Sequence, residues 1–302
     1  MLEFNENDFA VPPVIKEPVN HLGFYKIPMD EYRGANGLAN SELQIFKDNP
    51  SSYIWNQTAP IDKKKATTAD FGTSLHTSVL EPELYEDSVI ISSTKGREAA
   101  AFTKDQSNNP DKIVLTSNEY KQIEIMTASA KCDPMFNRLL EAEGECEASI
   151  FVDDPDTGLR LKIRVDKIVK GRDEPLFCDL KSAASIDEWR ADKPWLSPLF
   201  KFGYGFTASF YLYVGSIYYG VELSNYYFPV ISKAAMLGRY PVSVFTISKE
   251  ELIEYGFWQE MLDTLNEFAD RKKNNNWLSF EKFPMFNIYQ DDSVDIKFSD
   301  GP

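Results

Sequence analysis

The chain has 302 residues, of which 43% are hydrophobic and 14% aromatic, enough for a substantial core in one large domain or two small ones. Its formal net charge of −15 argues against a protein that coats nucleic acid non-specifically, because phosphate binding depends on Lys and Arg, but it does not exclude an enzyme with a local basic groove. The sequence shows no uncharged apolar run of about 18 residues and no basic-then-apolar amino terminus, so we expect a cytoplasmic protein without a membrane span.

The first part of the chain is predicted to be mainly helical. Residues 1–35 are rich in Pro and Asn and show little periodicity, so we expect an irregular N-terminal arm. Residues 38–60 predict a helix that is capped by Asn40 or Ser41 and stops near a proline. Apolar residues at helical spacing predict a second helix over residues 67–87.

The middle of the chain changes from helical to β-type patterns. A polar segment, residues 93–112, is expected to be partly loop and to precede a long amphipathic helix over residues 117–142. Three β-type runs then follow, separated by the turn signals DDPDTG and KGRDE, at residues 147–152, 159–169 and 175–183. They predict a three-stranded antiparallel meander.

The remaining elements complete the predicted α/β fold, which has a mixed central sheet flanked by helices. In chain order they are an aromatic-rich helix over 200–220, a strand pair over 225–232 and 240–248, and a helix over 249–273. We expect a single domain over residues 36–285, followed by a polar C-terminal tail over residues 286–302.

The strand expected over residues 159–169 alternates between apolar and charged residues. Because successive side chains of a strand point to opposite faces, its apolar and charged positions form separate faces. The apolar positions are Leu159, Leu161, Ile163 and Val165, and the charged positions are Arg160, Lys162, Arg164 and Asp166. One face is therefore expected to be a basic stripe that ends in an acid.

Asp179 and Lys181 stand two residues apart in the next apolar run, LFCDLKSA, and so share a face. If the turn over residues 170–174 pairs the two strands, Asp166 and Asp179 come close together, with Lys181 beside them. Two adjacent carboxylates repel unless a cation lies between them, and such oxygen ligands suit Mg²⁺ or Mn²⁺. A surface ladder of salt bridges is the alternative that this pattern leaves open.

The pattern VDKI…DLK resembles the two acids and the lysine of the PD-(D/E)xK nuclease superfamily. More specifically, the run FGTSLHTSVLEPE at residues 71–83 resembles the motif of the RecE-type exonucleases, the family of exodeoxyribonuclease VIII and its phage relatives. The segments NPSSYIWNQTAP, TGLRLKIRVDKI, DLKSA and GFTASFYLYV follow in the order of that family, so the resemblance spans roughly residues 38–280. It implies the PD-(D/E)xK restriction-endonuclease-like core.

The resemblance also implies the metal site. It assigns the metal ligands to His76, Asp166, Asp179 and the backbone carbonyl of Leu180, with Mg²⁺ as the expected ion and Mn²⁺ as a substitute. Lys181 is then expected to orient or activate the attacking water. For His76, the alternative without a motif is an ordinary helix-surface histidine.

Further candidate site residues lie on two other elements. Glu147 opens the first meander strand and could hold a metal-bound water or a second ion, although a solvated strand end is an equally good reading. Tyr204, Thr207 and Tyr211 share one face of the expected helix over 200–220. Relatives usually carry glutamine where this chain has Thr207, which leaves its catalytic role open, and Tyr211 fits a core position equally well.

By resemblance, the protein is expected to be an exonuclease that degrades linear double-stranded DNA from 5′ to 3′ and leaves a 3′ single strand for a strand-annealing recombination partner. Candidate DNA contacts are Arg160, Lys162, Arg164 and Tyr204, with the lysine run 63–65 as a weaker patch. Relatives form rings around DNA, so we expect a ring-shaped homo-oligomer in a phage or prophage setting in a bacterial cell.

Two other functions remain open at this point. One is a non-catalytic DNA-end-binding protein on a nuclease fold, which the complete set of His76, Asp166, Asp179 and Lys181 argues against. The other is an endonuclease or Cas4-like member of the superfamily. The three cysteines, Cys132, Cys146 and Cys178, cannot supply the four thiolates of an iron–sulfur cluster, so we expect reduced structural thiols.

Overall fold

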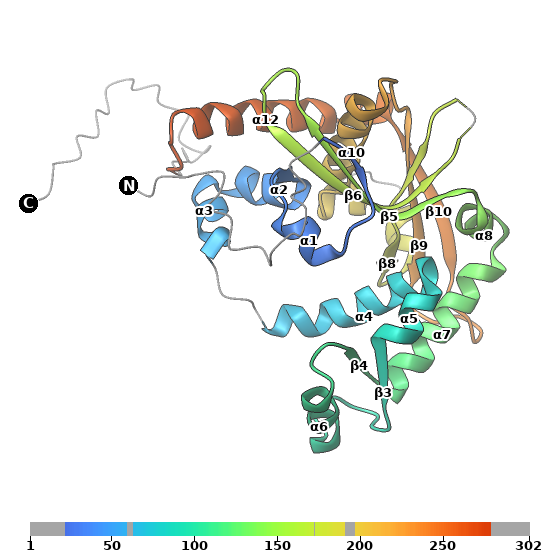
Figure 1. Ribbon diagram of the computed structural model, residues 1–302. Helices are drawn as coiled ribbons and strands as arrows, with labels where there is room; N and C mark the ends of the chain where they lie inside the picture. Colours follow the sequence, from blue (N-terminus) through green and yellow to red (C-terminus); the bar gives the residue numbers. More distant parts are fainter. Residues whose placement is uncertain (1–21, 59–62, 172, 191–196, 279–302) are drawn as a thin grey trace, which may run out of the picture.

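A mixed eight-stranded sheet forms the centre of the computed structural model, which describes residues 22–58, 63–171, 173–190 and 197–278 (Figure 1). The strand order is β1-β5-β6-β7-β9-β10, with β2 paired to β6 and β8 paired to β9. The strands are β1 (Gly23–Tyr25), β2 (Leu38–Ala39), β5 (Gly144–Asp153), β6 (Arg160–Val169), β7 (Leu176–Cys178), β8 (Lys181–Ala183), β9 (Asn225–Ser232) and β10 (Val242–Ser248).

The strand pairings confirm the predicted antiparallel meander and the mixed sheet. β5, β6 and β7 pair antiparallel in sequence order, and β9 pairs antiparallel with β10. β7 and β8 instead pair parallel with β9, which the chain reaches through helix α10 (Tyr204–Tyr219). Parallel neighbours need such a crossover, because a tight turn cannot return the chain in the same direction.

Helices cover the sheet in two groups, seen above and below it in Figure 1. α10 packs with α2 and α12 in one core, which contains Phe46, Phe210 and Phe268. α4 and α7 pack in a second core, which contains Leu75 and Met126. The other helices are α1 (Met29–Gly34), α2 (Asn40–Asp48), α3 (Pro50–Thr58), α4 (Lys63–Leu80), α5 (Pro82–Ser88), α6 (Ala100–Asn108), α7 (Ser117–Cys132), α8 (Pro134–Glu141), α9 (Pro198–Lys201), α11 (Lys249–Glu254), α12 (Phe257–Lys273) and a 3₁₀ turn (Ile186–Arg190).

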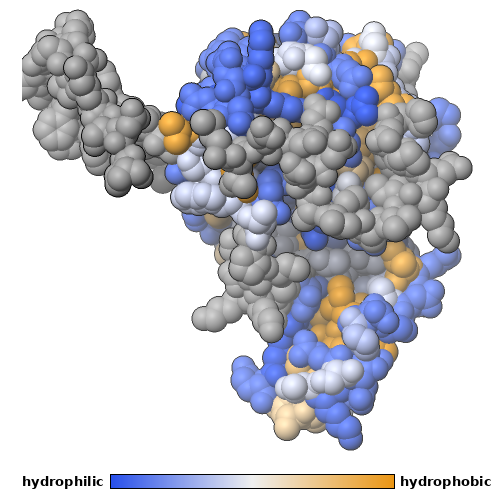
Figure 2. Space-filling view, turned by 60° about the vertical axis from the view of Figure 1, so that its left-hand side comes forward, coloured by the Kyte–Doolittle hydropathy of each residue, from blue (hydrophilic) through white to orange (hydrophobic). Residues whose placement is uncertain are grey.

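A small parallel sheet, β3 (Val89–Ser92) and β4 (Ile113–Thr116), was not predicted. It flanks α6, which lies inside the polar segment expected to be partly loop. These elements form the lower end of the molecule in Figure 1, and Figure 2 shows hydrophobic side chains framed by hydrophilic ones there. Ile91 of β3 is 50% exposed, so this sheet is only partly covered.

Several predicted elements are divided in the structure. The helix over 117–142 breaks at Asp133, because the Asp133 carboxylate accepts the Phe136 N–H at 2.8 Å and caps a new helix that starts at Pro134. The helix over 249–273 breaks at Gly256, whose φ of +84° lies in the left-handed region.

The amino-terminal elements also differ from their predictions. The described part of the expected irregular arm contains β1 and α1, and α2 is capped at Ala39 instead of at Asn40 or Ser41. The Glu42 carboxylate accepts the Ala39 N–H at 2.8 Å. The rest of the arm and the predicted tail over 286–302 lie outside the described residues.

Two further findings bear on the expectations from composition. No helix in the described ranges is both long and apolar enough to cross a membrane. Cys132, Cys146 and Cys178 all lie in the described ranges and form no disulfide bond there.

Candidate metal centre

Three acidic residues lie side by side across the meander. In the β5–β6 pair, Cys146 is opposite Lys167 and Ala148 is opposite Val165, so Glu147 and Asp166 face each other. In the β6–β7 pair, Lys167 is opposite Cys178, and the same register places Asp166 opposite Asp179. The structure therefore brings Asp166 and Asp179 together as the turn over 170–174 predicted, with Glu147 completing the row.

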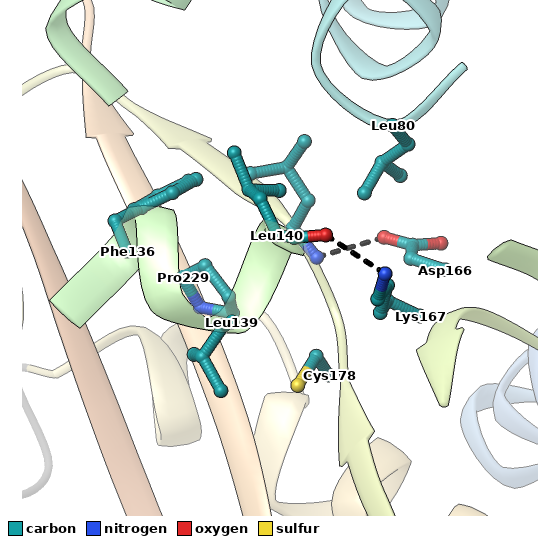
Figure 3. A pocket seen from close by; sticks show the side chains of 9 residues that line it. Leu80, Phe136, Leu139, Leu140, Asp166, Lys167, Cys178 and Pro229 are labelled. Atoms are coloured by element: carbon teal, nitrogen blue, oxygen red, sulfur yellow. Dashed lines mark hydrogen bonds between the residues drawn. The ribbon is translucent and has the colours of Figure 1, made fainter. Parts of the chain in front are cut away.

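His76 reaches this row from α4. Its Nδ1 atom lies 3.5 Å from Oδ2 of Asp166. One potential ligand atom from each of His76, Glu147 and Asp166 lies within 4.8 Å of the other two. The Leu180 N–H donates to Oδ2 of Asp166 at 2.8 Å, and Figure 3 shows the Asp166 carboxylate with this bond. A helix and three neighbouring strands thus converge on one small volume.

Glu147 has an unusual backbone conformation. Its φ of +54° places a non-glycine residue in the left-handed region, at a cost of roughly 1–2 kcal/mol. Arg164 Nε lies 2.7 Å from the Glu147 carboxylate, and both side chains are mostly buried. Strained backbone of this kind is concentrated at functional sites, and here a buried ion pair holds the carboxylate beside Asp166.

Asp179 and Lys181 lie at a break in the predicted strand over 175–183. The chain leaves the sheet at residues 179–180 and rejoins it as β8, so the single predicted strand is two short ones. Lys181 Nζ lies 2.7 Å from the Asp179 carboxylate and 4.9 Å from the centre of the Tyr204 ring. At this break the Asp179 N–H still donates to the Tyr227 carbonyl of β9 at 2.9 Å, and the Lys181 side chain returns to the Asp179 carboxylate.

Burial and neighbouring acids raise the pKa values of Asp166 and Glu147. Burial is the largest effect that raises the pKa of Asp166 well above its usual range, and the neighbouring Asp179 adds to it. Burial also raises the pKa of Glu147, although the hydrogen bond from Arg164 opposes this. A divalent cation held among these carboxylates would oppose both shifts, because it would stabilise the charged forms.

His76 is suited to binding a metal because it is neutral at pH 7. Its pKa is lowered to about 4, mainly by burial and then by the positive charge of Lys181, against smaller opposing effects from Asp179 and the Leu180 backbone. A neutral imidazole keeps a nitrogen lone pair for a ligand. This environment differs from that of an ordinary helix-surface histidine.

The donor set fits a divalent cation. Oδ2 of Asp179 is buried, and its close charged neighbour among the described residues is the Lys181 ammonium, whose nitrogen lies 2.7 Å away. Carboxylate oxygens suit Mg²⁺ and Mn²⁺, and imidazole nitrogen binds many divalent metals. His76, Glu147, Asp166 and Asp179 therefore form the candidate metal centre, with Glu147 as a potential ligand instead of a solvated strand end.

The predicted basic stripe on β6 is not an open DNA-binding face. Lys162 is 2% exposed, and its ammonium donates to three backbone carbonyls in the amino-terminal segment, those of Tyr32, Arg33 and Ala35. An ammonium has three N–H groups, so none is left for a phosphate. Lys162 therefore anchors the amino-terminal segment, which corrects the expected DNA contact.

The two arginines of the stripe also have partners within the protein. Arg164 pairs with Glu147 and donates to the Ile27 carbonyl at 2.5 Å. Arg160 pairs with Asp153 at 2.9 Å. Arg164 is therefore held within the protein, whereas the ion pair of Arg160 is exposed and its contact with DNA stays a prediction. The side chains of the lysine run 63–65 lie outside the described residues.

Thr207 joins two helices and does not have a free hydroxyl for the metal centre. Its Oγ1 accepts hydrogen bonds from Asn40 at 3.1 Å and Gln44 at 2.9 Å, and donates to the Gly203 carbonyl at 3.2 Å. One donor and two acceptor positions are all that a hydroxyl has. The expected catalytic role of Thr207 is therefore corrected to a structural contact between α2 and α10.

The two tyrosines on α10 lie closer to the acids. The Tyr211 hydroxyl donates to the Arg164 carbonyl at 3.1 Å, which holds β6 two residues before Asp166. The Tyr204 ring lies under the Lys181 ammonium and stacks on Trp189 at 5.7 Å. Tyr211 therefore positions β6, and Tyr204 packs against Lys181. Neither hydroxyl makes a hydrogen bond with the predicted metal ligands.

Arg164 is the site residue whose role sequence reasoning missed. It was expected to contact DNA, but it fixes Glu147. The DDPDTG turn could have revealed this pairing, because it sets the register of β5 and β6. That register places Ser149 opposite Arg164, so Arg164 lies diagonally across from Glu147.

Comparisons with known proteins agree with this description. Residues 40–277 match the model of a family described as the PDDEXK-like domain of unknown function, DUF3799. A crystal structure from Eubacterium rectale, named as a candidate exonuclease, has a TM-score of 0.56 at 14% identity and covers 83% of this chain and 88% of that one. A second structure, SSO0001, is also 14% identical over 64% of this chain and 85% of that one, but its TM-score is only 0.26. No curated protein matches the chain.

The two informative comparisons carry different weight. At 14% identity, the Eubacterium rectale structure shows a shared fold alone. The family model spans well over half of the sequence, from the start of α2 to residue 277, and includes every residue of the candidate metal centre. The chain therefore belongs to the PDDEXK-like family DUF3799 and has the PD-(D/E)xK nuclease fold.

Proposed function

We propose that this protein is a metal-dependent deoxyribonuclease that acts on the ends of linear double-stranded DNA. The observation that carries the proposal is the convergence of His76, Glu147 and Asp166 within 4.8 Å, beside the ion pair of Asp179 and Lys181. A buried group of acids with a neutral histidine and a lysine is well suited to phosphodiester hydrolysis. The nuclease fold of the family supports the same reaction class.

A divalent metal held at this site would lower the pKa of a coordinated water and offset charge on the scissile phosphate. Glu147, Asp166, Asp179 and His76 hold the ion in this proposal. Mg²⁺ is the preferred ion because most of the donors are carboxylate oxygens, and Mn²⁺ is the expected substitute.

Lys181 contributes as a charged hydrogen-bond donor. Burial lowers its pKa, but Asp179 and Asp166 outweigh this effect, so the pKa is raised overall and the ammonium keeps its proton. A protonated lysine orients the attacking water and stabilises the phosphate charge, and it is a poor general base. Of the two roles expected for Lys181, orientation is therefore the better supported.

The finer assignment rests on the resemblance to RecE-type exonucleases. It includes digestion from 5′ to 3′, a 3′ single strand passed to a strand-annealing protein, a ring-shaped homo-oligomer around DNA, and a phage or prophage setting in the bacterial cytoplasm. A ring would allow an acidic chain to keep its basic residues on the inner wall.

Nucleotide release from linear and closed-circular double-stranded DNA tests the proposal. The wild type is compared with Lys181→Ala, in Mg²⁺ or EDTA, and Lys170→Ala serves as the control because its ion pair with Glu143 is exposed. We expect Mg²⁺-dependent loss of linear DNA only, abolished by Lys181→Ala alone. Cleavage of the circle would show an endonuclease, and binding without cleavage would support the end-binding alternative.

Strand-specific labels separate the finer claims. A label at the 5′ end should be released early, and one at the 3′ end should persist on a long strand. The reverse order would contradict the assigned polarity and leave the nuclease activity intact.

A further inference from the structure

A buried tyrosine hydroxyl next to the candidate metal centre has no hydrogen-bond partner. Tyr226 lies in β9, is 0% exposed, and its hydroxyl makes no hydrogen bond with any of the described residues. Leaving a buried hydroxyl unpaired costs about 1–3 kcal/mol. Its ring neighbours include Phe228, at 5.0 Å, so phenylalanine would suit this apolar surrounding better.

The strand register places Tyr226 beside the acids. Tyr226 is opposite Phe177 in the parallel β7–β9 pair, and the Asp179 N–H donates to the next carbonyl on β9, that of Tyr227, at 2.9 Å. Partners in a strand pair point to the same face of the sheet, so Tyr226 shares the face of Phe177. Because alternate residues of a strand also share a face, Asp179, two residues after Phe177, is expected on that face as well. The Tyr226 ring also contacts the Tyr211 ring at 5.9 Å, edge to face.

A buried carboxylate oxygen lies on the same side. Oδ2 of Asp179 lies 2.7 Å from the Lys181 ammonium nitrogen and makes no well-aligned hydrogen bond with the described residues. The Tyr226 hydroxyl therefore lacks a partner in the same region as a carboxylate oxygen that has room for a further donor. The negative charges of Asp179 and Asp166 also act on the Tyr226 hydroxyl, adding to the effect of burial in raising its pKa.

We propose that Tyr226 is a positioning residue of the metal centre, whose hydroxyl donates to the Asp179 carboxylate directly or through one water when a divalent cation is bound. This inference rests on the proposed function. Carboxylates that bind a metal are usually held by such hydrogen bonds, and losing one typically weakens metal binding or activity by roughly 10- to 100-fold. A hydrogen bond to Asp179 would explain why a tyrosine, and not a phenylalanine, occupies this apolar position.

Tyr226→Phe tests the inference, because it removes one oxygen and keeps the ring. Tyr85→Phe is the matched control: Tyr85 is 6% exposed, and its hydroxyl also has no hydrogen-bond partner among the described residues, but it stacks on Tyr120 in the α4–α7 core. The primary readout is Mn²⁺ binding by calorimetry on the full chain. Thermal unfolding in EDTA checks that both variants fold.

We expect Tyr226→Phe to weaken Mn²⁺ binding by about tenfold or more, and Tyr85→Phe to leave it unchanged. In EDTA, both variants should be at least as stable as the wild type, since each loses an unpaired hydroxyl. In an Asp179→Ala background, Tyr226→Phe should have no further effect on Mn²⁺ binding, because its acceptor is gone.

Equal Mn²⁺ affinities for the wild type and Tyr226→Phe would overturn the inference and leave the metal centre standing. A loss of the same size in the Asp179→Ala background would also overturn it, because the hydroxyl would then act elsewhere. A wild type that binds no Mn²⁺ would instead refute the proposed function, so the two failures are distinguishable.

Discussion

Replacing Asp166 with asparagine should make the metal-free protein more stable. Asp166→Asn keeps the shape of the side chain and the oxygen that accepts the Leu180 N–H at 2.8 Å, but it removes the central charge of the acidic row. One carboxylate oxygen of Asp166 and one of Glu147 lie within 4.8 Å of each other. Two unit charges at that distance repel by about 3.5 kcal/mol at an effective dielectric constant of about 20.

The cations next to the row reduce this gain. Arg164 pairs with Glu147 and Lys181 with Asp179, each at 2.7 Å, so they offset part of the repulsion. We therefore expect Asp166→Asn to raise the metal-free free energy of unfolding by about 1–2 kcal/mol at pH 8, roughly 2–6 °C in melting temperature. Mg²⁺ or Mn²⁺ should then stabilise the wild type more than the variant, which has lost a ligand.

The stability difference between Asp166→Asn and the wild type should depend on pH. Asp166 has a raised pKa in the folded protein, so its contribution to stability is fully present below the unfolded pKa and is lost as pH rises through the folded pKa. The advantage of Asp166→Asn should therefore be small near pH 4 and grow toward pH 8. Thermal unfolding in EDTA at several pH values measures this directly.

The control is Asp153→Asn, which removes an acid that is 47% exposed in its side chain and pairs with Arg160 outside the acidic row. It should show neither the pH-dependent gain nor a loss of metal stabilisation. If Asp166→Asn were less stable than the wild type in EDTA at pH 8, the acids would not be in net repulsion. If the variant gained as much from Mg²⁺ as the wild type, Asp166 would not be a ligand.

Three further substitutions test single contacts. Lys181→Met should abolish DNA cleavage at saturating Mg²⁺ while DNA binding persists, and cleavage at the wild-type rate would exclude the lysine from the reaction. Lys162→Met should lower the free energy of unfolding by about 1–3 kcal/mol, because three carbonyls lose their donor, yet leave the salt slope of DNA binding unchanged; a smaller slope would return Lys162 to the DNA interface. Thr207→Val should cost about 1–3 kcal/mol in the same measurement, because Asn40 and Gln44 lose their acceptor, while DNA cleavage at permissive temperature continues; complete loss of cleavage would reinstate a catalytic threonine.

Local patterns were sufficient for the meander and for much of the metal centre. Alternation in β5 and β6 and the short turns between strands determine which residues face each other, so the juxtaposition of Asp166 and Asp179 followed from sequence. The LHTSVLEPE run identified His76 by resemblance, although no local rule could place α4 beside β6. The break at residues 179–180 was missed, because the apolar run continues through it.

The partners of the charged residues were decided by the tertiary structure. Alternation assigned Arg160, Lys162 and Arg164 to one face, and that assignment alone made the face look open to DNA. The segment that contains β1 and α1, more than 120 residues away in sequence, packs over this face and takes the Lys162 ammonium with its carbonyls. A strand pattern reports which side chains share a face, whereas what covers that face depends on long-range packing, and only this packing separates a buried anchor from a phosphate-binding cation.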